Sequence, residues 1–286
     1  MKHKSAQAVC LNFMTALSCE AKPLIDYYGL VKQSYTAFPH FFKPTCEQHP
    51  YNINLVVSGI GMQSMATACG WLSGVSTNEP AVWLNIGTAG HGTLQLGEIV
   101  RVVCATQANA KTTHFPPLVA KWGGVNAPLI SSTAPVSRYP EQSLVDMEAS
   151  AFFMAAKRFA SAELVQALKV VSDNKDNSIE QLNAAKLSAF IAERMDAIHQ
   201  FSEALLELAA AEKIISQIPQ FSHQLHSTHS QTQQFGDLTN KLVNLCMDKQ
   251  EINNIISKAA NMKALLAELK DKHATMIPDL KIVNSD

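Results

Sequence analysis

The segment Leu144 to Phe153, LVDMEASAFF, limits the possible folds of this chain more than any other. Its first apolar residues predict a short strand that runs directly into an alanine-rich helix, with the carboxylate Glu148 at the junction. A second junction follows downstream, where Val165 to Val171 are predicted to form a buried strand that ends in Ser172 and Asp173. Because open α/β sheets bind ligands outside the carboxyl ends of their strands, we expect the two acids to line one crevice.

Strands and helices are predicted to alternate along the first three quarters of the chain. Apolar runs predict strands at residues 8–17, 53–57, 81–86 and 98–105, and a proline-punctuated hairpin at 35–46. Helices are predicted at 20–28, 62–72 and 148–159, and a long one at 178–213 that Ser178 and Gln181 would cap. This alternation predicts a three-layer α/β domain.

Composition excludes several classes of partner. The formal net charge is −1 and no long run of Lys or Arg is present, which argues against nucleic acid and favours a small molecule. The six cysteines are scattered without metal-ligand spacing, which is typical of reduced thiols in a cytoplasmic protein. Residues 1–19 imitate a secretion leader, but a first buried strand is the preferred interpretation. No apolar segment approaches the roughly 20 residues that span a bilayer.

The C-terminal part differs in composition from the rest. We expect one domain at 1–213, a Gln/Ser/His-rich linker at 214–235 and a helical extension at 236–286. His223, His226 and His229 recur at every third position, so metal binding is an alternative to a solvated linker. Apolar residues of the extension repeat at heptad-like intervals, with skips at Lys249 and Lys263, and predict a helix or helical hairpin that packs on the main domain or on a partner chain.

Two glycine motifs accompany the acids. Gly59-Ile60-Gly61 and Gly87-Thr88-Ala89-Gly90 each follow a predicted strand, where glycine lets the backbone approach a ligand closely. Together with the two acidic motifs they resemble, in the same order, the purine nucleoside phosphorylase and nucleosidase superfamily. The likeness is greatest to the 5′-methylthioadenosine/S-adenosylhomocysteine nucleosidases and covers roughly residues 8–205. It implies an αβα phosphorylase/hydrolase-like fold with a mixed central sheet, to which the C-terminal helices are added.

The resemblance also implies roles for three carboxyl groups. Asp173 would protonate the departing purine at N7, Glu148 would hold the ribose hydroxyls, and Glu20 would take a proton from the attacking water. An ordinary Asp has a pKa of about 3.9, so the site or the ligand must keep the proton on Asp173. From its position alone, Glu20 fits equally well as a favourable charge in the first turn of a helix. Further substrate contacts are expected from Gly61, Thr88, Ala89, Gly90, Met147 and Ser172.

Other positions depart from the family pattern. Lys169 stands where the hydrolases usually carry an arginine, and His91 replaces a glycine, which either narrows the pocket or places the ring outward. The region 106–136 is shorter than its family counterpart and shows no clear aromatic for stacking on the base. Phe115, Trp122 and Tyr139 are the candidates, each with a core or surface position as the alternative.

The main functional question is whether water or phosphate is the nucleophile. Phosphorylases of the superfamily hold phosphate with arginines, yet no arginine precedes Arg101, so hydrolysis is favoured over phosphorolysis. The leading hypothesis is therefore a purine nucleoside N-ribosyl hydrolase that needs no cofactor and forms a homodimer, as the resemblance implies. A nucleoside phosphorylase is the enzymatic alternative. The shortened region and the added tail motivate a third, a nucleoside-binding or assembly module without turnover.

Overall fold

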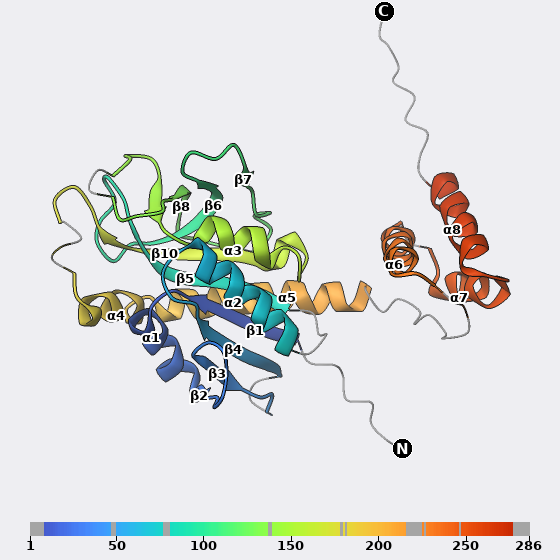
Figure 1. Ribbon diagram of the computed structural model, residues 1–286, viewed down its shortest axis with the longest axis horizontal. Helices are drawn as coiled ribbons and strands as arrows, with labels where there is room; N and C mark the ends of the chain where they lie inside the picture. Colours follow the sequence, from blue (N-terminus) through green and yellow to red (C-terminus); the bar gives the residue numbers. More distant parts are fainter. Residues whose placement is uncertain are drawn as a thin grey trace, which may run out of the picture. The chain divides into compact units, whose positions relative to one another are not determined.

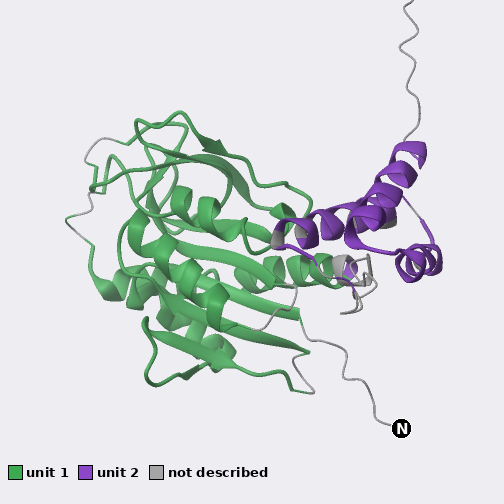
Figure 2. Cartoon of the chain, turned by 45° about the vertical axis from the view of Figure 1, so that its right-hand side comes forward, with its two compact units in different colours: residues 1–210 green, residues 211–286 purple. Residues whose placement is uncertain are grey.

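The structure, a computed structural model, describes residues 9–46, 50–76, 81–136, 139–177, 180, 182–215, 225, 227–245 and 247–276. The leader-like first eight residues, the predicted cap Ser178 with Gln181, and His223 with His226 lie outside the described residues. The chain forms two compact units, residues 1–210 and 211–286 (Figure 2). The five cysteines within the described ranges are free thiols.

A mixed sheet forms the centre of the first unit (Figure 1). Its parallel middle consists of four strands with long apolar runs, which is the composition expected where both faces of a strand are covered. These strands are β1 (Val9–Thr15), β4 (Tyr51–Val57), β5 (Ala81–Gly90) and β10 (Val165–Asp173). All four therefore end at the same edge of the sheet.

The remaining strands extend the sheet on both sides. They are β2 (Val31–Lys32), β3 (His40–Lys43), β6 (Ile99–Gln107), β7 (Thr113–His114), β8 (Val125–Ser131) and β9 (Leu144–Asp146). The order is β10-β6-β8-β9-β5-β1-β4-β3-β2, with β7 beside β6. Since β10 pairs with both β6 and β5, the strands β5, β9, β8, β6 and β10 close into a ring.

Helices cover both faces of the sheet, as alternate residues of β1 show. Cys10 and Met14 face one core with α2 (Met62–Val75) and α3 (Ala149–Ala156). Leu11 and Phe13 face the other core, which contains residues of α1 (Ser18–Tyr28), α4 (Ala184–Ala192) and α5 (Met195–Ile215). A short 3-10 helix, Ala162–Leu164, leads into β10. The predicted three-layer α/β fold with a mixed sheet is confirmed.

Two predicted element boundaries were wrong near the sheet. The third parallel strand was predicted to end at Ile86, but β5 continues to Gly90, because Gly90 pairs with Asp173 of β10 and with Val145 of β9. The predicted hairpin at 35–46 is instead formed by β2 and β3, so its first strand precedes Tyr35.

The predicted helix at 178–213 is two helices. Leu182 and Asn183 are not helical, and the Asn183 side chain caps α4 by accepting a hydrogen bond from the Lys186 amide at 2.9 Å. The break between α4 and α5 falls at residues 193–194, where Arg194 Nε donates to the Gly97 carbonyl at 2.6 Å. A contact with a distant loop thus fixes a bend that helical periodicity does not reveal.

The second unit is helical, with a core of its own. Its described residues form α6 (His229–Asn244), α7 (Lys249–Lys258) and α8 (Met262–Met276), so this described part has three helices where one or two were predicted. Helix α6 begins inside the range expected as linker. The skips in the apolar repeat coincide with the starts of α7 and α8. Ten buried residues form the core, among them Leu242, Ile252 and Leu265. No described helix is long and apolar enough to cross a membrane.

Candidate active site

A cavity of about 240 Å³ lies where the parallel strands of the first unit end. This volume is slightly below the range of about 300 to 1,000 Å³ usual for small-molecule sites, and it suits a small ligand. The cavity is lined by all but one of the predicted site residues, namely Glu20, Thr88, Ala89, Gly90, Met147, Glu148, Ser172 and Asp173. The exception, Gly61, contacts the site through its amide.

Glu148 occupies the position just before α3, at the junction that the sequence pattern identified. Its Oε1 accepts a hydrogen bond of 2.7 Å from the Gly61 amide, and its Oε2 accepts one of 3.3 Å from Met147. Gly61 has φ +99°, a conformation that favours glycine, so the tight turn before α2 brings its amide to the carboxylate. Burial raises the pKa of the Glu148 carboxyl, and the nearby Lys169 partly offsets this.

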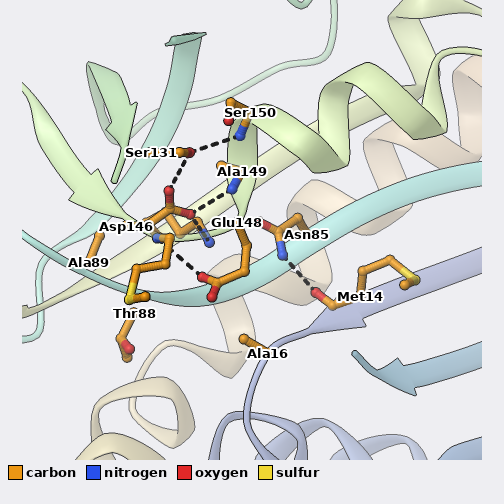
Figure 3. Close-up of polar contacts among 12 residues, drawn as sticks. Met14, Ala16, Asn85, Thr88, Ala89, Ser131, Asp146, Glu148, Ala149 and Ser150 are labelled. Atoms are coloured by element: carbon orange, nitrogen blue, oxygen red, sulfur yellow. Dashed lines mark hydrogen bonds and ion pairs between the residues drawn. The ribbon is translucent and has the colours of Figure 1, made fainter. Parts of the chain in front are cut away.

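Asp146 and Lys169 form a buried ion pair behind Glu148. Lys169 Nζ lies 2.9 Å from Asp146 Oδ2, and both side chains are almost fully buried, with exposed fractions of 2% and 1%. Asp146 also accepts hydrogen bonds from the Ser131 hydroxyl at 2.6 Å and the Ala149 amide at 2.9 Å (Figure 3). Every oxygen of Asp146 is thus engaged inside the protein.

The charge on Lys169 depends on these surroundings. Burial by itself lowers the pKa of the Lys169 ammonium. The attraction of Asp146 is the strongest opposing effect, and with two further carboxylates nearby the pKa is raised overall. Sequence reasoning noted Lys169 only as a departure from the family and missed Asp146. The one local hint at a role for Asp146 was its place in the sequence, directly before the predicted site residues Met147 and Glu148.

Glu20 is buried in the first turn of α1, with an exposed fraction of 3%. Its Oε2 accepts hydrogen bonds from the amides of Ala16 at 3.2 Å and Leu17 at 3.0 Å, so it caps the start of its own helix. Its Oε1 accepts two from Thr88, one from the amide and one from the hydroxyl, both at 2.8 Å. One carboxylate thus both caps its own helix and lines the cavity.

Asp173 ends β10 and is buried. The Ser172 hydroxyl donates a short hydrogen bond to its Oδ1. A Cβ at Gly90 would collide with the Tyr139 ring and lie 2.8 Å from Asp173 Oδ2, so glycine is required there for close packing. The carboxyl of Asp173 and the ring of Tyr139 thus meet at one wall of the cavity.

Of the three aromatic candidates, only Tyr139 lines the cavity. Phe115 is 73% exposed. Trp122 packs in the core against Phe201, with ring centroids 5.3 Å apart, and its Nε1 donates to the Val125 carbonyl at 3.0 Å. The core and surface alternatives therefore hold for these two residues.

His91 is not among the residues that line the cavity. Its ring is buried, and its Nδ1 accepts hydrogen bonds of 3.1 Å from the amides of Thr93 and Leu94. Burial lowers the pKa of the His91 imidazole. His91 therefore stabilises the loop after β5 in its neutral form.

The rest of the cavity wall is largely apolar. It includes Leu17, Ile60, Val136, Leu182 and Leu187. None of the lining residues is an arginine, lysine or histidine. Among the residues that the structure describes, no group of three or more Asp, Glu, His or Cys side chains is placed to hold a metal ion. The site thus combines four carboxyl groups, those of Glu20, Asp146, Glu148 and Asp173, with an apolar wall and a tyrosine ring.

Comparison with known proteins finds similar solved structures but no similar sequence. Neither a protein-family model nor a curated protein matches the sequence. Among solved structures, the 5′-methylthioadenosine/S-adenosylhomocysteine (MTA/SAH) nucleosidase of Colwellia psychrerythraea in complex with adenine is similar, with a TM-score of 0.55 at 14% identity. The match covers 70% of this chain and 96% of that one.

Two other nucleosidase structures are similar over a comparable share of the chain. A variant from Chlamydia trachomatis bound to MTA gives a TM-score of 0.52 at 19% identity, covering 67% of this chain and 97% of that one. The Streptococcus enzyme from S. pneumoniae with a transition-state inhibitor gives 0.50 at 17% identity, covering 71% and 99%. The chain therefore has the fold of the MTA/SAH nucleosidases.

Proposed function

We propose that this protein is a purine nucleoside N-ribosyl hydrolase, which cleaves the N-glycosidic bond of an adenosine-type nucleoside, including 5′-modified ones. The observation that carries the proposal is the convergence of Glu20, Glu148 and Asp173 on one small cavity. Similar folds that bind adenine and MTA support the choice of nucleoside. Bond cleavage needs a proton donor for the base, negative potential at the ribose and a base for water, and three carboxyl groups supply these.

Asp173 is the proposed proton donor to the purine. Its carboxyl is buried beside the Tyr139 ring and accepts a hydrogen bond from Ser172, which fixes its orientation. A purine stacked near Tyr139 would present a ring nitrogen to Asp173. The proton shared between them would then neutralise the leaving base as the bond breaks.

Glu148 is the proposed ribose ligand. A carboxylate offers about four acceptor positions, and Glu148 uses one for a strong bond from Gly61 and one for a long bond from Met147. The remaining lone pairs are available to sugar hydroxyls. The negative charge of Glu148 would also stabilise the oxocarbenium-like transition state.

Hydrolysis is favoured over phosphorolysis by the charge of the cavity. Among the residues that the structure describes, no cationic side chain lines it. Lys169 is paired with Asp146, and Arg101 is buried elsewhere, where its Nε donates to Asn126 at 2.9 Å. Within the described part of the site, a phosphate dianion would meet carboxylates without an arginine to hold it.

The test is release of free base from methylthioadenosine and adenosine in phosphate-free buffer, followed by chromatography. We expect release without phosphate, and a rate that falls by about 10² to 10⁴ in Asp173→Asn. Asp26→Asn is the matched control, because Asp26 is exposed, does not line the cavity and pairs with the exposed Lys22. Strict dependence on phosphate, with ribose 1-phosphate as product, would identify a phosphorylase instead.

Binding without turnover would support the third alternative. Isothermal titration with adenine and methylthioadenosine measures binding independently of cleavage. Tight binding by a protein that releases no base would identify a nucleoside-binding or assembly module. The homodimer that the family resemblance implies is part of the proposal, and light scattering on the full chain tests it.

A further inference from the structure

Glu20 has no free acceptor position for a water molecule. Its carboxylate already accepts four hydrogen bonds, which fills the roughly four positions that a carboxylate offers. Three of the donors are backbone amides, of Ala16, Leu17 and Thr88, and they cannot turn away without unravelling the end of β1, the start of α1 or the end of β5. The fourth donor, the Thr88 hydroxyl, is on a rotatable side chain.

Thr88 lines the cavity beside Glu20 and is hydrogen-bonded to it. It lies near the end of β5, and its hydroxyl donates to Glu20 Oε1 at 2.8 Å. A threonine hydroxyl has one proton to donate and two lone pairs that accept. Because the proton is directed to Glu20, only the lone pairs of Oγ1 remain for a molecule inside the cavity.

Lys169 also lies near Glu20. A Cβ at Gly87 would lie 3.2 Å from Glu20 Oε1 and 3.2 Å from Lys169 Nζ, so the two groups approach the same point, which the absence of a side chain at Gly87 leaves open. Lys169 is buried and paired with Asp146. Of these two neighbours, the Thr88 hydroxyl is the one that both donates to Glu20 Oε1 and lines the cavity, so a proton can reach Glu20 Oε1 from the cavity through it.

We propose that Thr88 is a catalytic residue that relays a proton from the attacking water to Glu20. This inference rests on the proposed hydrolase function. As the water oxygen forms its bond to C1′ of the ribose, one water O–H bond breaks and its proton passes to Thr88 Oγ1. The Thr88 O–H bond breaks at the same time, and its proton passes to Glu20 Oε1. The base leaves with the glycosidic electron pair and receives its proton from Asp173, so atoms and charges balance.

The relay makes a prediction that direct attack on a water by Glu20 does not make. Thr88→Val keeps the shape of the side chain and removes the hydroxyl, which frees one acceptor position on Glu20. If Glu20 acted directly on water, this variant would be as fast as the parent or faster. The relay predicts instead that kcat falls by about 10² to 10⁴ while KM changes less than about threefold. Thr88→Ser, which keeps the hydroxyl, should stay within about tenfold of the parent.

The experiment measures kcat and KM for base release by the full chain, the two variants and the control Thr67→Val. Thr67 is exposed on α2, and its hydroxyl donates only to the Gln63 carbonyl, so its loss should leave both constants unchanged. Thermal melting confirms that each variant is folded. If Thr88→Val does not fold, Thr88→Ala takes its place beside Thr88→Ser.

Each outcome decides a separate point. A parent protein that releases no base overturns the proposed function and the relay with it. An active parent with an equally active Thr88→Val overturns the relay alone. A folded Thr88→Ser as slow as Thr88→Val also overturns it, because the hydroxyl would then carry no proton. A slow Thr88→Val with an active Thr88→Ser supports the relay.

Discussion

Replacement of Lys169 by methionine removes one half of the buried pair and leaves the other half in place. The Asp146 side chain is 1% exposed, so water cannot compensate its charge, and only the Ser131 hydroxyl and the Ala149 amide still stabilise it. Removing one partner of a buried ion pair typically costs about 3 to 5 kcal/mol. For a unit of this size, a loss of about 1 kcal/mol in unfolding free energy lowers the melting temperature by about 2 to 4 °C. We therefore expect the melting temperature to fall by about 6 to 20 °C.

The assay can be confined to the unit that contains the pair. All three tryptophans, Trp71, Trp83 and Trp122, lie in residues 1–210, so their fluorescence reports unfolding of that unit and not of the C-terminal helices. Urea titration at neutral pH, with this signal, gives the free energy of unfolding. Lys22→Met is the matched control, because the pair Lys22–Asp26 has a similar length of 2.7 Å but is exposed, and it should cost only about 0 to 1 kcal/mol.

A double variant separates the charge effect from lost packing. In Asp146→Asn with Lys169→Met, no buried charge is left without a partner, so most of the lost stability should return. If the double variant is as unstable as Lys169→Met alone, the loss comes from packing and the explanation by uncompensated charge is wrong. A loss below about 1 kcal/mol in Lys169→Met would refute it too.

Two further predictions concern the cavity. Glu148→Gln should lower the rate of base release by about 10² to 10³. Because the pKa of the parent carboxyl is raised above 4.5 by burial, the stability that Glu148 contributes is present below that pH and lost as pH rises through the folded-state pKa. The Gln variant should therefore gain stability relative to the parent between pH 4 and pH 8 in urea titrations, and a gain that shrinks as pH rises would contradict this. Gly90→Ala should cost about 1 to 3 kcal/mol and slow base release, because the new methyl group meets Tyr139 and Asp173. Gly70→Ala, in α2 with open space around it, should be neutral or stabilising in the same melting experiment.

Local sequence patterns predicted the architecture because each element is encoded by a few neighbouring residues. Continuous apolar runs such as 53–57 become the buried parallel strands, and the change from strand to helix at Glu148 is visible in ten residues. An acid that follows a parallel strand lies at the carboxyl edge of the sheet, which is why Asp173 was predicted to line one crevice with Glu148. The prediction for Glu20 came from the family resemblance.

The positions of element ends depended on residues far along the chain. Strand β5 continues to Gly90 because β9 and β10 pair with it there, and the bend between α4 and α5 is held by Arg194 on the Gly97 carbonyl. Neither partner lies within the window in which periodicity is read. The sequence also left open which aromatic residue reaches the cavity, and packing around Gly90 selects Tyr139.

What the chain's sequence alone determined is the alternation of strands and helices and the edge of the sheet at which Glu148 and Asp173 emerge. What only the tertiary structure decided is which hydrogen bonds each acid makes. Asp146 is paired with Lys169, and Glu20 accepts four hydrogen bonds. Glu148 accepts two and keeps lone pairs free for a ligand. The physical reason is that apolar periodicity acts between neighbours in the chain. Hydrogen-bond capacity and burial, in contrast, are set by groups that meet in space.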